Sequence, residues 1–183
     1  PSLTTVIIPE GSAFARIAYY AFYNSGLTSI DFTNAKGLVT IDNHAFDGCA
    51  DLAEIKFSDS TNNLEILEYA FAGTAVKSLD LPACVIKIGD HAFYNVSALG
   101  KVNVASGSIL EEIGAYAFSG TSLTSFNFSA TESLKEIGAY AFTETGITAV
   151  VLGDSVTKIG DHAFYGCENV KEFKLSEGIE SIG

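Results

Sequence analysis

The hexapeptide IGDHAF occurs twice in the chain, at residues 88–93 and 159–164, and a related hexapeptide, IGAYAF, occurs at residues 113–118 and 137–142. The dipeptide Ala-Phe marks a full series of such units, because it recurs seven times with steps of 22 to 25 residues. Its copies are Ala21-Phe22, Ala45-Phe46, Ala70-Phe71, Ala92-Phe93, Ala117-Phe118, Ala141-Phe142 and Ala163-Phe164. Internal repeats of this length predict a solenoid, in which each unit buries its apolar residues against its neighbours.

Each unit also has fixed internal spacing. An apolar residue opens it, a second follows three positions later and a third two positions after that, as in Leu27, Ile30 and Phe32. The last two have the period of a short strand with one buried face. An Ile lies four positions before each Ala of the Ala-Phe series. Length varies in two windows rich in Gly, Ser, Asn, Asp and Thr, which favour turns. The sequence therefore predicts one short strand per unit, with the Ile-Gly-x-x-Ala-Phe segment opposite it as a turn or 3₁₀ segment.

The units predict a single domain of seven full repeats and a partial eighth. The full repeats are residues 3–26, 27–51, 52–75, 76–98, 99–122, 123–146 and 147–169, and the partial one is residues 170–183. The chain starts inside a repeat, stops before the Ala-Phe of the eighth unit and contains no methionine. Solenoids need polar caps at their ends for solubility. We therefore expect the chain to be a fragment of a longer protein, and to be monomeric unless uncapped ends associate.

Charge and composition exclude several classes of function. The chain has 22 acidic and 10 basic residues, a net charge of −12, which repels nucleic acids and anionic membrane surfaces. Its 13 Phe and 8 Tyr supply ample material for a core. No stretch approaches the roughly 18 apolar residues of a membrane span, and no signal peptide opens the segment. We expect no nucleic-acid binding and no direct membrane insertion of this segment.

The sequences LPACVIKIGDHAF at residues 81–93 and LGDSVTKIGDHAFYGC at residues 152–167 show the full pattern of a unit. They resemble the BspA-like (Treponema pallidum-type) leucine-rich repeats, and the resemblance covers essentially the whole chain. It implies a right-handed leucine-rich-repeat superhelix with a parallel sheet, which is a β-rich solenoid of the α/β type. It also implies a cell-surface or secreted protein linked to adhesion and host-protein binding. From this we expect the partner to be a host or extracellular-matrix protein or a glycan.

The residue before each Ala of the Ala-Phe series is Tyr or His in all seven units. These residues are Tyr20, His44, Tyr69, His91, Tyr116, Tyr140 and His162. One interpretation is structural: each amphipathic ring lies over the Phe column with its polar tip in water. The other is an aromatic contact strip for a protein or glycan, which Tyr94, Tyr165 and Tyr23 would widen. The exposed positions of the predicted strands are small, polar and of mixed charge, and offer no aromatic anchor.

The sequence offers no set of residues for catalysis, metal binding or a cofactor. His44, His91 and His162 lie in units two, four and seven, and at about 4.8 Å per unit they are too far apart to share a zinc ion. Cys49 and Cys167 are five units apart, beyond disulfide range, and Cys84 occupies a different corner, where intermolecular pairing stays open. No catalytic motif is present.

We therefore expect a non-catalytic extracellular module for adhesion or for protein or glycan recognition. The alternative is a passive structural spacer that presents another domain away from the cell envelope. The plain strand face favours the spacer, and the fold itself does not decide between the two.

Overall fold

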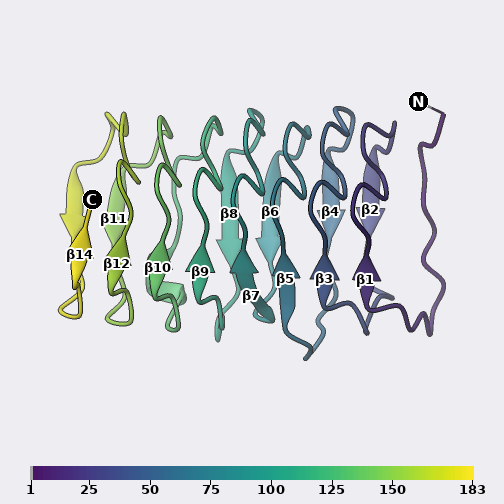
Figure 1. Cartoon of the computed structure of the whole chain (residues 1–183), viewed down its shortest axis with the longest axis horizontal. Coiled ribbons are helices and arrows are strands. Elements are labelled where there is room, and N and C mark those ends of the chain that lie inside the picture. The colour runs from purple at the N-terminus through teal and green to yellow at the C-terminus, as the bar shows by residue number, and fades with distance from the viewer. Residues whose placement is uncertain (1) are drawn as a thin grey trace.

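The structure is a computed structural model that describes residues 2–183. The chain winds into a solenoid, and we call each circuit, which corresponds to one repeat unit, a coil. Figure 1 shows the coils side by side along the long axis, with the N-terminus at one end and the C-terminus at the other. The predicted repeat solenoid is confirmed.

One strand from each coil joins a continuous parallel sheet. Its strands, in spatial order, are β1 (Arg16–Ile17), β3 (Thr40–Ile41), β5 (Leu64–Ile66), β7 (Val85–Ile88), β9 (Glu112–Ile113), β10 (Glu136–Ile137), β12 (Lys158–Ile159) and β14 (Ser181–Ile182). The Ile of each strand pairs in register with the Ile of the next. In the seven full repeats these are the Ile residues that precede Ala-Phe by four positions, so this spacing fixes the register of the sheet.

Six of the coils have a second strand, and these strands form three separate parallel pairs. They are β2 (Ser29–Asp31) with β4 (Glu54–Lys56), β6 (Ser78–Leu81) with β8 (Lys101–Val104), and β11 (Ala149–Val151) with β13 (Glu172–Lys174). These are the strands that the sequence predicted. At the predicted positions of the other two full repeats, residues 3–8 form no strand and Phe126 makes only an isolated bridge to Val102. The prediction of one strand per coil was incomplete, because the continuous sheet runs through the Ile-Gly segment instead. Most strands of that sheet are only two residues long, too short for the alternation that reveals a strand.

The Ala-Phe segments that follow the continuous sheet are turns, as predicted. The described residues contain one short 3₁₀ helix, η1 (Phe128–Ala130), and it lies in a corner after the sixth predicted strand. One irregularity of the sequence also has a structural counterpart. Val85 lies three positions before its Ile and Leu64 only two, and the register of β5 and β7 shifts between Leu64 and Glu65.

The Phe residues of the Ala-Phe series form the centre of the core. Successive rings stack with centroids 5.1–5.5 Å apart and planes within 19° of each other. The five inner rings are fully buried, whereas Phe22 and Phe164, at the two ends, are partly buried. The small Ala beside each Phe leaves room for this stack, and the column links every coil to the next.

A column of glycines allows the coils to approach closely. Gly89, Gly114, Gly138 and Gly160 each follow a strand of the continuous sheet. A Cβ atom at any of them would lie 2.4–2.8 Å from the backbone of the preceding coil. Real Cβ atoms do not make such contacts, so the missing side chain sets the spacing of these four coils.

Candidate functional site

The seven predicted Tyr and His residues come together in one continuous stack, which we call the Tyr/His ladder. Successive ring centroids are 4.4–4.9 Å apart and the ring planes lie within 12° of parallel. The ladder runs in chain order from Tyr20 to His162 and therefore extends over seven coils. Their geometry therefore agrees with the prediction that these seven residues share one register position.

The backbone explains why the rings line up. All seven ladder residues have φ between +54° and +57°, a left-handed conformation that residues other than Gly adopt infrequently. From Tyr20 to Tyr140, each ladder N–H donates to a carbonyl of the next coil, for example Tyr69 to Asp90 at 3.0 Å and Tyr116 to Ala139 at 2.9 Å. The same dihedral angle and the same bond in successive coils give each ring the same direction.

Stacking decides which parts of the rings a partner can reach. The five inner ladder residues are half-buried, because each ring covers a face of its neighbour, while Tyr20 and His162 at the ends are exposed. Nδ1 of His91 is buried, and Nδ1 of His44 is bonded to Asp47. A partner therefore meets ring edges and phenol hydroxyls rather than open ring faces. Such a row supplies hydrogen-bond donors and acceptors at regular intervals along the axis.

Other tyrosines widen the ladder with edge-to-face contacts. Tyr94 lies 5.3 Å from His91, Tyr165 lies 5.7 Å from His162, and Tyr23 lies 4.9 Å from Tyr20. The sequence prediction did not include Tyr19, whose ring lies 4.2 Å from that of Tyr20 and whose side chain is exposed. Its register position holds non-aromatic residues in the other coils, so the repeat gave no signal, and only the adjacent pair of tyrosines pointed to it.

Local environment sets the protonation of two ladder members. Burial lowers the pKa of His91 below its usual value, against the opposing effect of Asp90 and Glu68, so the imidazole is neutral at pH 7. Burial also raises the pKa of Tyr69, with a contribution from Glu68. His44 contacts the Asp47 carboxylate through Nδ1 at 2.8 Å. At Tyr69 and His91 the ladder is thus neutral at pH 7, with carboxylates beside it.

The histidine and cysteine side chains are dispersed rather than clustered. Among residues 2–183, no three His, Cys, Asp or Glu side chains converge to hold a metal ion. The thiols of Cys49 and Cys167 donate to the carbonyls of Phe22 and Phe142, at 2.9 and 3.0 Å. Burial raises the pKa of the Cys49 and Cys84 thiols. The contacts of Cys49 and Cys167 are those of structural hydrogen-bond donors in the corners.

The exposed side of the continuous sheet carries charges that pair between coils. Lys87 contacts Glu112 at 2.9 Å, and Lys158 contacts Glu136 at 2.6 Å. Glu112 and Glu136 are opposite each other in register, an unfavourable arrangement that these lysines offset. Within the described residues, no helix is long and apolar enough to cross a lipid bilayer.

Comparison with known proteins identifies the repeat. The sequence matches the family described as BspA type Leucine rich repeat region, with six copies over residues 15–134 and 135–183. No curated protein matches it in sequence.

Several solved structures match the chain in a structural comparison. The pneumococcal vaccine antigen PcpA matches with a TM-score of 0.51 and 19% identity, over 91% of this chain and 57% of that one. A leucine-rich repeat protein from Bacteroides ovatus matches with a TM-score of 0.41 and 21% identity, over 90% and 65% of the two chains. A leucine-rich cell surface protein from Faecalibacterium prausnitzii matches with a TM-score of 0.45 and 22% identity, over 87% and 47%.

The chain spans less than two thirds of each of these proteins. At 19% identity the pneumococcal protein shows a shared fold and no more. The family match is of a different kind, because it extends over nearly the whole chain and reproduces the repeat that organises the core. The chain belongs to the BspA-type leucine-rich repeat family.

Proposed function

We propose that the chain is a non-catalytic recognition module of a cell-surface or secreted protein, and that the Tyr/His ladder is its contact surface. The family supports a role in protein binding or adhesion. We further propose that residues 3–169 are seven repeats of a single domain, with a partial eighth repeat at 170–183.

The observation that carries the proposal is the unbroken length of the ladder. Seven aromatic rings at steps of 4.4–4.9 Å form a straight row of exposed edges. Tyrosine is enriched where proteins bind each other, because it offers an apolar body and a polar tip. Since stacking occupies the ring faces, the row suits hydrogen bonds with a protein surface better than stacking against sugar rings. The favoured partner is a host or matrix protein, with a glycan as the other candidate.

The test must separate binding from stability. Replacing Tyr116 and Tyr140 by Ser would remove the hydroxyls but would also open a gap in the stack, where the two rings lie 4.7 Å apart. The double variant Tyr116→Phe/Tyr140→Phe keeps the rings and removes only the hydroxyls. We expect weaker binding to an immobilised extracellular-matrix preparation, with an unchanged melting temperature.

A matched control removes two hydroxyls elsewhere. Ser78→Ala/Ser125→Ala acts on exposed positions of the second strand path, away from the ladder, and should leave binding unchanged. Equal binding by the wild type and the Tyr→Phe double variant would rule out the ladder hydroxyls as the contact.

The alternative, a passive spacer, is favoured by one specific observation. Each inner ladder ring is already covered on both faces by its neighbours, so the ladder has a structural role that needs no partner. Absence of wild-type binding to any cell or matrix preparation would favour the spacer.

A further inference from the structure

A cleft of about 410 Å³ lies on the second strand path, where the pair β2–β4 meets the pair β6–β8. Four successive coils line it, from Thr33 to Ala105. Its volume is within the range of small-molecule sites in proteins. The cleft shares no residue with the Tyr/His ladder, so a ligand bound in it would not depend on the ladder contact.

The cleft exists because two neighbouring corners differ. β4 and β6 do not pair with each other, although β4 pairs with β2 and β6 with β8. In another coil, Phe32 N–H donates to the carbonyl of Lys56 at 2.8 Å. Phe57 is the equivalent residue one coil further on. In the described part of the chain, its backbone N–H makes no such bond to the next coil. A long corner, residues 58–63, follows Phe57, whereas the corner after β6 is short and begins with Pro82. The coils therefore separate here.

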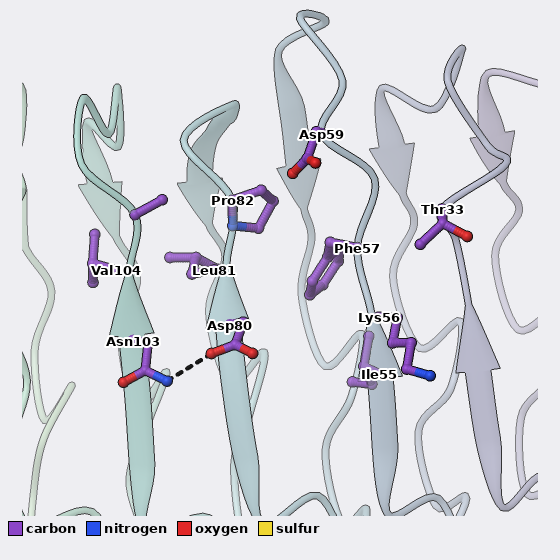
Figure 2. Close-up of a pocket in the computed structure, with 11 residues that line it drawn as sticks. Thr33, Ile55, Lys56, Phe57, Asp59, Asp80, Leu81, Pro82, Asn103 and Val104 are labelled. Atoms are coloured by element: carbon purple, nitrogen blue, oxygen red, sulfur yellow. Dashed lines mark hydrogen bonds between the residues drawn. The ribbon is translucent and has the colours of Figure 1, made fainter.

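One wall of the cleft is apolar. Figure 2 shows the ring of Phe57 in the space between β4 and β6, with Pro82 on the neighbouring coil, whereas the side chain of Leu81 is buried. Phe57 is only partly buried, and its ring stacks loosely on Phe32 at 6.0 Å. The Phe57 ring and the Pro82 ring together make a surface suited to C–H groups of a ligand.

The lining of the cleft also carries a hydrogen-bonded polar pair. Asn103 donates from Nδ2 to Asp80 Oδ1 at 2.6 Å, a bond that joins β8 to β6 (Figure 2). This bond holds both side chains in place. It leaves the second carboxylate oxygen of Asp80, the carbonyl oxygen of Asn103 and its other amide hydrogen for a ligand. Both side chains are exposed to solvent.

Charge narrows the class of ligand. Lys56 and the carboxylates of Asp59 and Asp80 line the same cleft. The two carboxylates and the net charge of −12 disfavour an anion, and Lys56 contacts the Glu54 carboxylate at 3.4 Å. Among residues 2–183 no third acidic, His or Cys side chain joins the two carboxylates to hold a metal ion. A neutral ligand with several hydroxyl groups fits, because each hydroxyl can donate to a carboxylate and accept from an amide. We propose that the cleft binds a neutral saccharide, with Asp80 and Asn103 bonding its hydroxyls and Phe57 packing against its C–H face.

The experiment is saturation-transfer NMR on the full chain with the neutral disaccharides lactose, maltose and cellobiose. Sialyllactose serves as the anionic probe and trilysine as the cationic probe. We expect at least one neutral disaccharide to bind. Loss of hydrogen bonds to the charged carboxylate predicts about tenfold weaker binding in Asp80→Ala, and loss of a neutral hydrogen bond predicts about fivefold weaker binding in Asn103→Ala. Asn127→Ala, the equivalent position one coil further on and outside the cleft, is the matched control and should bind like the wild type.

Three results would overturn the proposal: no neutral disaccharide binds, only a charged probe binds, or binding persists unchanged in both Asp80→Ala and Asn103→Ala. Both substitutions are at exposed positions, and equal melting temperatures would show that the variants are folded. The Tyr116→Phe/Tyr140→Phe variant should retain saccharide binding in full. A failure at the cleft and a failure at the ladder are thus distinguishable.

Discussion

The rings of Phe93 and Phe118 lie within 2° of parallel with their centroids 5.4 Å apart, and both side chains are fully buried. Each ring fills the space between its own coil and the next. The column therefore ties successive coils together along the axis of the solenoid.

Replacing Phe93 by Ala should lower the free energy of unfolding by about 3–5 kcal/mol, because it removes a buried ring and leaves a cavity at the centre of the column. Denaturant unfolding of the purified chain measures the loss. Phe93→Leu, which keeps most of the apolar volume, is the control and should cost clearly less. A loss below about 1 kcal/mol in Phe93→Ala would contradict the buried column.

The glycine column gives a second prediction. A Cβ atom at Gly138 would lie 2.5 Å from the backbone of Gly114 and Ala115. Gly138→Ala should therefore force two coils apart and cost about 1–3 kcal/mol or more. At Gly100 a Cβ atom would be 3.9 Å from its nearest neighbour, the carbonyl of Ser122, with no positive φ. Gly100→Ala should be neutral or slightly stabilising. Thermal unfolding compares the two, and equal melting temperatures would argue against close packing at Gly138.

The repeat made most of the fold predictable. Fixed spacing of the Ala-Phe series required equivalent residues to stack, and the Phe column and the ladder result directly from it. The continuous sheet was not predictable, because a strand as short as Glu112–Ile113 carries no alternation. Its register was implicit in the Ile spacing, but only the backbone shows that Ile113 pairs with Ile88 and Ile137.

The two candidate sites also differ in how far the sequence could predict them. The positions of the ladder residues could be predicted, but not the left-handed backbone that turns their ring faces toward each other. That detail changes what the surface can bind. The cleft was not predictable, because it depends on a hydrogen bond missing between two coils whose corners differ in length. A repeat pattern describes what the coils share, and the cleft arises from a difference between them.

A second left-handed position, four residues after each ladder residue, gives a third prediction. Gly or Asn occupies it in six coils, and Glu144, with φ of +58°, occupies it in the remaining one. A glutamate there carries a steric cost of about 1–2 kcal/mol that glycine avoids. Glycine loses more backbone entropy on folding, and this offsets part of the steric gain. Glu144→Gly should therefore stabilise the chain by about 0.5–1 kcal/mol.

The control is Glu168→Gly, at an exposed position without a positive φ, where glycine should be destabilising. Thermal unfolding of both variants decides the point. If Glu144→Gly lowered the melting temperature as much as Glu168→Gly, the left-handed strain at Glu144 would be refuted.

The ladder gives a pH-dependent prediction through His91. Burial lowers its pKa in the folded chain, while in the unfolded chain it returns to its usual value near 6.5. Below about pH 6.5 the unfolded chain therefore binds the proton more readily, and stability falls as pH falls until the folded-state pKa is passed. Carboxylates contribute mainly at lower pH, so the comparison is made between about pH 7.5 and 5.5.

Tyrosine occupies this ladder position in four of the seven coils, so His91→Tyr should keep the stack and remove the titrating group. We expect its melting temperature to fall less than that of the wild type over this pH range. Tyr116→Phe, which alters the ring stacked 4.8 Å from His91 without changing the imidazole, is the control and should keep the wild-type pH dependence. The same acid-induced decrease in His91→Tyr and in the wild type would show that the protonation of His91 does not destabilise the ladder.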